Sequence, residues 1–138
     1  MDQIKIIARY TDGRMIKGHT GNFSPHRSFF HMMPNEGHEP VKLKMSELKA
    51  VFIVKDFGGN PRYRESRRFD DGSGWVSRKL KIQFSDGEVM HGSSMNYTPE
   101  AIGFFVQPAD SNSNNDRVFI VNEAVETVSV QAGPVLVM

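Results

Sequence analysis

The chain has 138 residues, with 17 Lys and Arg against 16 Asp and Glu, so its formal net charge at pH 7 is +1. This length excludes a large multidomain enzyme, and the balanced charge excludes a chain that coats nucleic acid or membranes through its overall charge. The absence of cysteine excludes disulfide bonds and thiolate metal sites and is typical of a cytoplasmic protein. No apolar run has the length of a transmembrane helix or the position of a signal peptide, so we expect no membrane contact.

Residue choice favours an all-β fold, because Val and Ile together number 21 against 10 for Leu and Ala, and β-branched side chains pack best on pleated surfaces. Apolar residues alternate from Ile4 to Tyr10, which predicts a strand. Asp12-Gly13 follows and predicts a hairpin with a primed turn, in which Gly supplies a positive φ. Gly18 lies inside the returning strand and predicts a bulge or a sharp bend there.

Three further strands are predicted over residues 29–32, 41–45 and 50–54. The segment Ser46-Glu47-Leu48 predicts a single helical turn opened by a capping residue. Five short strands that bend at glycine, with one helical turn before the last strand, are typical of a small SH3-like or Sm-like barrel. The sequence therefore predicts a first five-stranded barrel over residues 1–54.

An arginine-rich connection, residues 55–78, follows this first barrel. From residue 55 to residue 81 the chain has eight basic and four acidic residues, a net charge of +4, which leaves −3 for the remainder. Guanidinium groups beside aromatic rings suit phosphate contact and base stacking, although the segment also fits a solvated linker or a strand pair with its arginines facing water. An anion- or nucleotide-binding site is predicted here, formed by Arg62, Tyr63, Arg64, Arg67, Arg68 and Trp75.

The sequence then repeats itself. Residues 5–34 align without a gap with residues 79–108 at an offset of 74, and residues 41–51 align with residues 118–128 at an offset of 77. The match includes a second hairpin signal, Asp86-Gly87, and a second glycine inside a strand, Gly92. It predicts a second five-stranded barrel over residues 79–131 and an apolar tail over residues 132–138 that could add to a sheet edge. A core of about 50 residues is marginal alone, so we expect the two barrels to pack together or exchange a strand.

One stretch of the second unit comprises the run 103–110, Asn114-Asn115 and Arg117-Val118-Phe119. With the paired motifs, this stretch resembles an uncharacterised bacterial family of small β domains, relatives of which occur in proteins that also carry PilZ-type cyclic-di-GMP domains. The resemblance spans most of the chain and implies cyclic-di-GMP as the first candidate ligand. A PilZ domain itself is not indicated, because residues 71–73 follow the arginines too closely and the closing glycine of the PilZ motif is missing.

Motifs for metal binding and catalysis are weak. The loop 110–116 matches only the first half of a calcium-binding loop, and no serine elbow or phosphate-binding glycine loop is present. Four histidines lie close together without a metal-binding spacing, at positions 19, 26, 31 and 38. We expect no catalytic residue, metal or cofactor, and a structural role in turns or bends for Asp12, Gly13, Gly18, Asp86, Gly87 and Gly92.

The sequence thus predicts a non-catalytic cytoplasmic binding or adaptor module in bacterial regulation, with a protein partner or self-association. Two alternatives remain open. The arginine-rich connection could bind a cyclic dinucleotide or single-stranded nucleic acid, and open strand edges with Met-rich faces could build a self-assembling structural protein.

Overall fold

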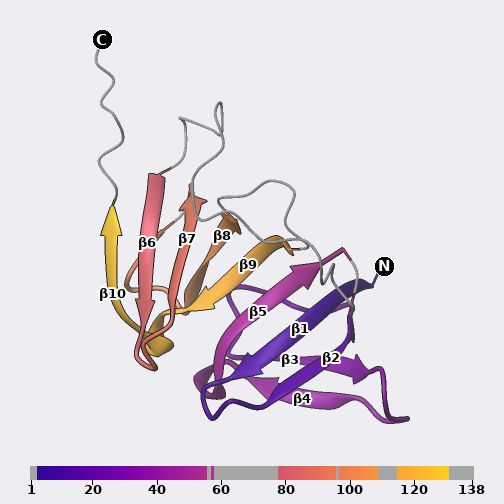
Figure 1. Ribbon diagram of the computed structural model, residues 1–138. Helices are drawn as coiled ribbons and strands as arrows, with labels where there is room; N and C mark the ends of the chain where they lie inside the picture. The colour runs from indigo at the N-terminus through magenta and orange to yellow at the C-terminus, as the bar shows by residue number, and fades with distance from the viewer. Residues whose placement is uncertain (1–2, 56, 58–77, 96, 109–114, 131–138) are drawn as a thin grey trace.

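The computed structural model describes residues 3–55, 57, 78–95, 97–108 and 115–130, and the regular elements among them are strands and 3-10 turns (Figure 1). The fold is all-β, as the abundance of β-branched residues predicts. The N-terminal half, residues 3–57, contains β1 (Ile4–Tyr10), β2 (Met15–Thr20), β3 (Phe29–Pro34), β4 (Val41–Lys44), the 3-10 turn η1 (Met45–Glu47) and β5 (Leu48–Val54).

The C-terminal half, residues 78–130, has the same succession of elements. It contains β6 (Arg78–Phe84), β7 (Val89–Ser94), β8 (Gly103–Pro108), β9 (Asn115–Val121), the 3-10 turn η2 (Asn122–Ala124) and β10 (Val125–Val130). The registers of the two halves also correspond: Ala8 pairs with Val51, and at offsets of 74 and 77 residues Ile82 pairs with Val128. The pairs of β1·β2, β2·β3 and β3·β4 have counterparts at the same offsets.

All ten strands belong to one antiparallel sheet, in the order β10-β6-β7-β8-β9-β5-β1-β2-β3-β4. The expectation of two closed five-stranded barrels is wrong. The outer side of β5 hydrogen bonds to β9 of the other half and not to β4 of its own half, so the described strands form one sheet that does not close. Figure 1 shows β3 and β4 lying at a steep angle to β5 and β1, so the N-terminal half is curled but open.

Two hydrophobic cores, one in each half, meet at the β5·β9 pair, which we call the junction. Successive residues of β5 point to different cores: Val51 packs in the N-terminal core and Phe52 in the C-terminal core. On β9, Phe119 packs in the N-terminal core and Ile120 in the C-terminal core. Every residue of β5 is therefore buried, and the two halves cannot separate without exposing both cores.

Both predicted hairpins are present, but the predicted turn type is wrong. Gly13 and Gly87 have φ values of 95° and 96°, and no other residue described in these two turns has a positive φ. Each glycine donates its backbone N–H to the last residue of the preceding strand, to the carbonyl of Tyr10 at 3.1 Å or of Phe84 at 2.9 Å. This is a three-residue loop with a type I turn and a left-handed glycine, because a primed turn needs a positive φ at its first central residue.

Gly18 and Gly92 lie where neighbouring strands approach most closely. A Cβ atom on Gly18 would overlap the carbonyl oxygen of Met33, and one on Gly92 would overlap the Val106 side chain and crowd the Gln107 carbonyl oxygen. Both glycines belong to the short two-pair ladders β2·β3 and β7·β8. The sheet therefore needs glycine at these positions for close contact between backbones, in the strands where the sequence predicts a bend.

Candidate interaction surface at the free sheet edges

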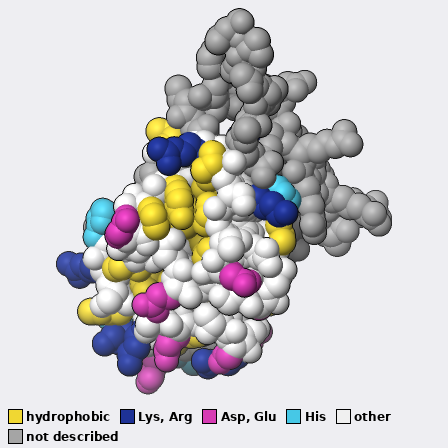
Figure 2. Space-filling view, turned by 90° about the vertical axis from the view of Figure 1, so that its left-hand side faces the viewer, with side chains coloured by type: hydrophobic (Ala, Val, Ile, Leu, Met, Phe, Trp, Pro, Cys, Tyr) yellow, Lys and Arg dark blue, Asp and Glu magenta, His cyan; other side chains and the backbone are white. Residues whose placement is uncertain are grey.

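The two ends of the sheet, β4 and β10, have no further strand beside them among the residues described. An edge strand presents backbone N–H and C=O groups that can pair with a strand of another chain. Four of the six residues of β10 are exposed, and Val130 is 56% exposed. On β4, Lys42 and Lys44 are exposed and Leu43 is buried. Figure 2 views the molecule from the β10 side and shows hydrophobic side chains in yellow among charged ones on that face.

The junction shows how such edges join in this protein. Antiparallel pairing places Ala50 opposite Ile120 and Phe52 opposite Val118. Both residues of each pair belong to the C-terminal core, so backbone pairing and apolar burial act together. The same two kinds of edge that are joined here, the fifth strand of one half and the fourth strand of the other, are free at the two ends of the sheet.

A cluster of charged side chains fastens the junction. Lys49 lies at an irregularity of β5, between the residues that pair with Tyr10 and Arg9, and its side chain is only 7% exposed. Its ammonium donates to Asp86 at 2.7 Å, in the turn between β6 and β7, and also contacts Glu88, just after that turn. Lys49 Nζ also lies 4.6 Å from the centroid of the Phe84 ring, which gives the buried cation a further attractive contact.

The hydrogen bond from Lys49 lowers the pKa of Asp86 below its ordinary value, and a second hydrogen bond from the backbone N–H of Glu88 acts in the same direction. In the equivalent turn of the N-terminal half, Asp12 accepts hydrogen bonds from the backbone N–H and the guanidinium of Arg14, at 3.0 and 2.8 Å. The backbone hydrogen bond is the main reason that the pKa of Asp12 is lowered. The structure thus gives both aspartates a place within their turns, and gives Asp86 a contact across the junction as well.

An aromatic cluster completes the junction on its N-terminal side. The Phe23 ring meets the rings of Phe119 and Phe105 edge to face, with centroids 5.2 and 6.1 Å apart. Edge-to-face pairs of this kind stabilise beyond the apolar area that they bury. The guanidinium of Arg117 lies 4.5 Å from the Phe105 centroid and covers the outer side of this cluster. The N-terminal core thus depends on two rings that belong to the C-terminal half.

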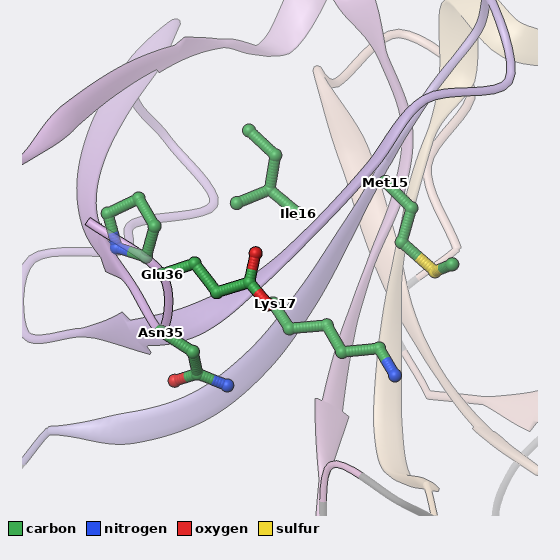
Figure 3. A pocket seen from close by; sticks show the side chains of 6 residues that line it. Met15, Ile16, Lys17, Asn35 and Glu36 are labelled. Carbon is green, nitrogen blue, oxygen red and sulfur yellow. The ribbon is translucent and has the colours of Figure 1, made fainter.

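A shallow hollow lies beside β2 and the end of β3, where the chain continues from Pro34 (Figure 3). Its charged side chains are Lys17 and Glu36, and Lys17 Nζ donates to the carbonyl of Phe57 at 3.2 Å. The lining mixes apolar and polar groups without a pair of titratable side chains held in a shared hydrogen bond. Within the ranges that the structure describes, no group of three His, Asp or Glu side chains could hold a metal ion. The free sheet edges are therefore the better candidate for function.

Comparison with protein families gives one match: a model described as a family of unknown function (DUF6982) covers residues 2–132. The chain belongs to this family. No curated protein and no solved structure matches it. The expected membership of a family without an assigned activity is thus confirmed, and the link to proteins with PilZ domains stays a prediction.

The arginine-rich site predicted for this DUF6982 member lies outside the described residues, and so do residues 109–114 of the asparagine-rich loop and the apolar tail. The structure neither joins nor separates Arg62, Tyr63, Arg64, Arg67, Arg68 and Trp75. Among the segments that are described, no helix is long and apolar enough to cross a membrane.

Sequence reasoning missed Lys49 as a residue that joins the halves. A signal was present, because Lys49 aligns with Glu126 at the offset of 77 residues, and Arg14 aligns with Glu88 at the offset of 74. In the folded chain, Lys49 and Glu88, one residue of each aligned pair, contact each other across the junction.

Proposed function

We propose that this protein is a non-catalytic cytoplasmic binding module that acts in regulation and holds a protein partner along the free edges of its sheet. One observation carries the proposal: the sheet ends in a fourth-strand edge and a fifth-strand edge, and the junction pairs these two kinds of edge with burial on both faces. The edges differ from the junction in exposure, since β5 is buried throughout and β10 is mostly exposed. A strand from a partner protein would pair with the backbone N–H and C=O groups of β4 or β10, as β9 pairs with β5 in the junction.

Site-specific photo-crosslinking in cells that express the protein tests this proposal. A photo-reactive amino acid replaces Lys42 on β4 or Ser129 on β10, and in the control it replaces Glu100, which is exposed in the loop before β8. We expect a crosslinked protein from both edges and none from Glu100. The captured protein, identified by mass spectrometry, should also bind the purified chain in a titration. Absence of any adduct from both edges would overturn the proposal.

A second candidate function rests on the segregated charge of the chain. The segment 55–81 has a net charge of +4, and four arginines lie between residues 62 and 68. Arginine offers a planar fork for phosphate and a face for stacking, which suits a cyclic dinucleotide or a single nucleic-acid strand. The resemblance to a family found beside PilZ domains favours cyclic-di-GMP as the first ligand to try.

Titration of cyclic-di-GMP and of a short oligonucleotide at low salt tests this second function. The variant carries Arg64→Ala, Arg67→Ala and Arg68→Ala, and we expect it to lose binding that the wild type shows. The control removes the same charge at three exposed positions outside this segment, Lys5, Arg27 and Lys44. Equal binding by both variants, or no binding by the wild type, would contradict the prediction.

A further inference from the structure

The two free edges of the sheet correspond to the two strands that pair with each other in the junction. At the offset of 77 residues, β10 is the counterpart of β5 and β4 is the counterpart of β9. Each counterpart pairs with its inner neighbour in the same register, β10 with β6 as β5 with β1, and β4 with β3 as β9 with β8. The pairing that joins two halves in one chain can therefore join β10 of one copy to β4 of the next.

Two of the three charges of the junction cluster are reversed at the free ends and remain complementary, whereas Asp86 has Asp12 as its counterpart, which is paired with Arg14 in its own turn. In the junction Lys49 contacts Glu88, which lies just after the turn between β6 and β7. The counterpart of Lys49 is Glu126, which lies at the matching irregularity of β10, and the counterpart of Glu88 is Arg14, just after the turn between β1 and β2. In a contact between copies, Glu126 of one copy would therefore meet Arg14 of the next, in place of Lys49 and Glu88. Both exchanged groups are exposed.

Arg14 can make this contact without leaving its own turn. It donates Nε–H to Asp12 at 2.8 Å, and its side chain is 67% exposed. A guanidinium has five N–H donors, so its remaining donors can reach a carboxylate of another copy. Asp86 stands in the same way beside Glu88 in the junction, where it accepts from both the turn backbone and Lys49.

The aromatic cluster has a matching counterpart. In the junction, Phe23 of the N-terminal half meets Phe105 and Phe119 from across the β5·β9 pair. The residues at the aligned positions of the free ends are Tyr97, His31 and Lys42. Across copies, an aromatic ring would therefore face an imidazole and an ammonium, which is an attractive arrangement of cation and ring and a more polar one than the junction has.

We propose that the partner at both free edges is a second copy of this chain, with β10 of one copy paired antiparallel to β4 of the next. The junction register sets the new one, with Thr127 opposite Leu43 and Ser129 opposite Val41. This deepens the proposed function, on which it rests. The contact is head-to-tail, so repetition gives a ring if the rotation closes and a filament if it does not. It is weaker than the junction, because Lys42 and Lys44 occupy the positions of two buried apolar residues.

Analytical ultracentrifugation of the full chain at low salt, over a range of concentrations, tests the proposal. We expect the wild type to form a closed oligomer or longer polymers whose share rises with concentration. Glu126→Arg or Arg14→Glu alone should abolish the assembly, because each places like charges opposite one another. The double variant should restore it, since it recreates the Lys49–Glu88 chemistry of the junction. A wild type that stays monomeric at its highest soluble concentration would overturn the proposal.

The matched control is Glu100→Arg, which reverses the same charge at an exposed position on neither edge strand, and it should assemble like the wild type. Circular dichroism melts check that the variants are folded. Failure of the double variant to reassemble, with its fold intact, would also count against the proposal. Failure here is distinct from failure of the proposed function: crosslinking at the edges to a different protein would keep a binding module and reject a second copy as the partner.

Discussion

Glycine in the middle of a strand is costly, and the two glycines of β2 and β7 are explained by what lies opposite them. A Cβ on Gly18 would collide with the backbone of β3, whereas a Cβ on Gly21 would sit 3.6 Å from the Gln3 side chain in ordinary contact. We expect Gly18→Ala to lower the free energy of unfolding by about 1–3 kcal/mol, the usual cost of overpacking, and Gly21→Ala to change it little. Urea denaturation measures both, and equal values would contradict the claimed close approach.

Lys49 is the buried cation of the junction, and its removal tests what it contributes. Lys49→Met keeps most of the apolar length of the side chain but leaves Asp86 and Glu88 without their ammonium partner, with Arg9 3.6 Å from Glu88. We expect the free energy of unfolding to fall by about 1–3 kcal/mol, the range for hydrogen bonds to charged groups. Lys81→Met, at an exposed position of β6, is the control and should be neutral.

The ion pair of Lys49 and Asp86 predicts that stability depends on pH. The pKa of Asp86 is lower in the folded protein than its ordinary value of about 3.9. Its contribution to stability is therefore complete above the unfolded pKa and is lost as the pH falls through the folded pKa. The stability difference between wild type and Lys49→Met should shrink below about pH 4. Asp12, whose pKa is lowered by Arg14, titrates in both proteins and cancels from this difference. A difference that stays constant down to the acid limit would contradict the pairing.

At the scale of elements, the sequence contains a signal for the junction that argues against two separate barrels. Residues 50–54 of β5 and residues 118–121 of β9 are unbroken apolar runs, which are typical of strands buried on both faces. The aligned runs in β4 and β10 alternate between apolar and polar residues, as strands with one wet face do. Strand positions, hairpins and the 3-10 turns follow from such local signals. Which strand pairs with β5 does not, because it depends on contacts between residues far apart in the chain.

The shared strands predict that the halves unfold as one unit. Phe119 belongs to the C-terminal half but is fully buried in the N-terminal core, against Phe23 and Phe105. Phe119→Ala should cost about 3–5 kcal/mol of unfolding free energy, the usual range for a buried Phe. Hydrogen exchange should show a similar loss of protection in β1 and in β6. The control Phe29→Ala, at a position 36% exposed, should cost much less. Loss of protection confined to one half would contradict the shared core.

At the scale of the whole molecule, the sheet is open, with the junction buried at its centre and an edge strand exposed at each end. The junction has apolar residues at two positions of β9, Phe119 and Val121, where the free edge β4 has Lys42 and Lys44. Lysines on an edge strand oppose uncontrolled pairing with other chains. The side chains at these two positions therefore set the affinity of one copy for the next. With lysine there, the pairing between copies is reversible, whereas the junction is part of the folded chain.

This difference gives a prediction that strengthens the assembly instead of breaking it. Lys42→Phe with Lys44→Val places the apolar residues of the junction on the free edge, so they would pack in the C-terminal core of the next copy, as Phe119 and Val121 pack in the N-terminal core. We expect the oligomer to persist at much lower protein concentration than for the wild type, measured by ultracentrifugation. The reason is the apolar area buried, about 25 cal/mol per Å².

Added apolar side chains can cause any protein to aggregate, so a control must show that the stronger association depends on the proposed edge. Lys5→Phe with Lys55→Val adds similar apolar groups at exposed positions on neither edge strand and should leave the oligomer as in the wild type. Adding Glu126→Arg to the strengthened variant should weaken the assembly again, because Glu126 lies on the opposite edge of the contact. Association that rises equally in the control, or that ignores Glu126→Arg, would show general aggregation and contradict pairing of β10 with β4.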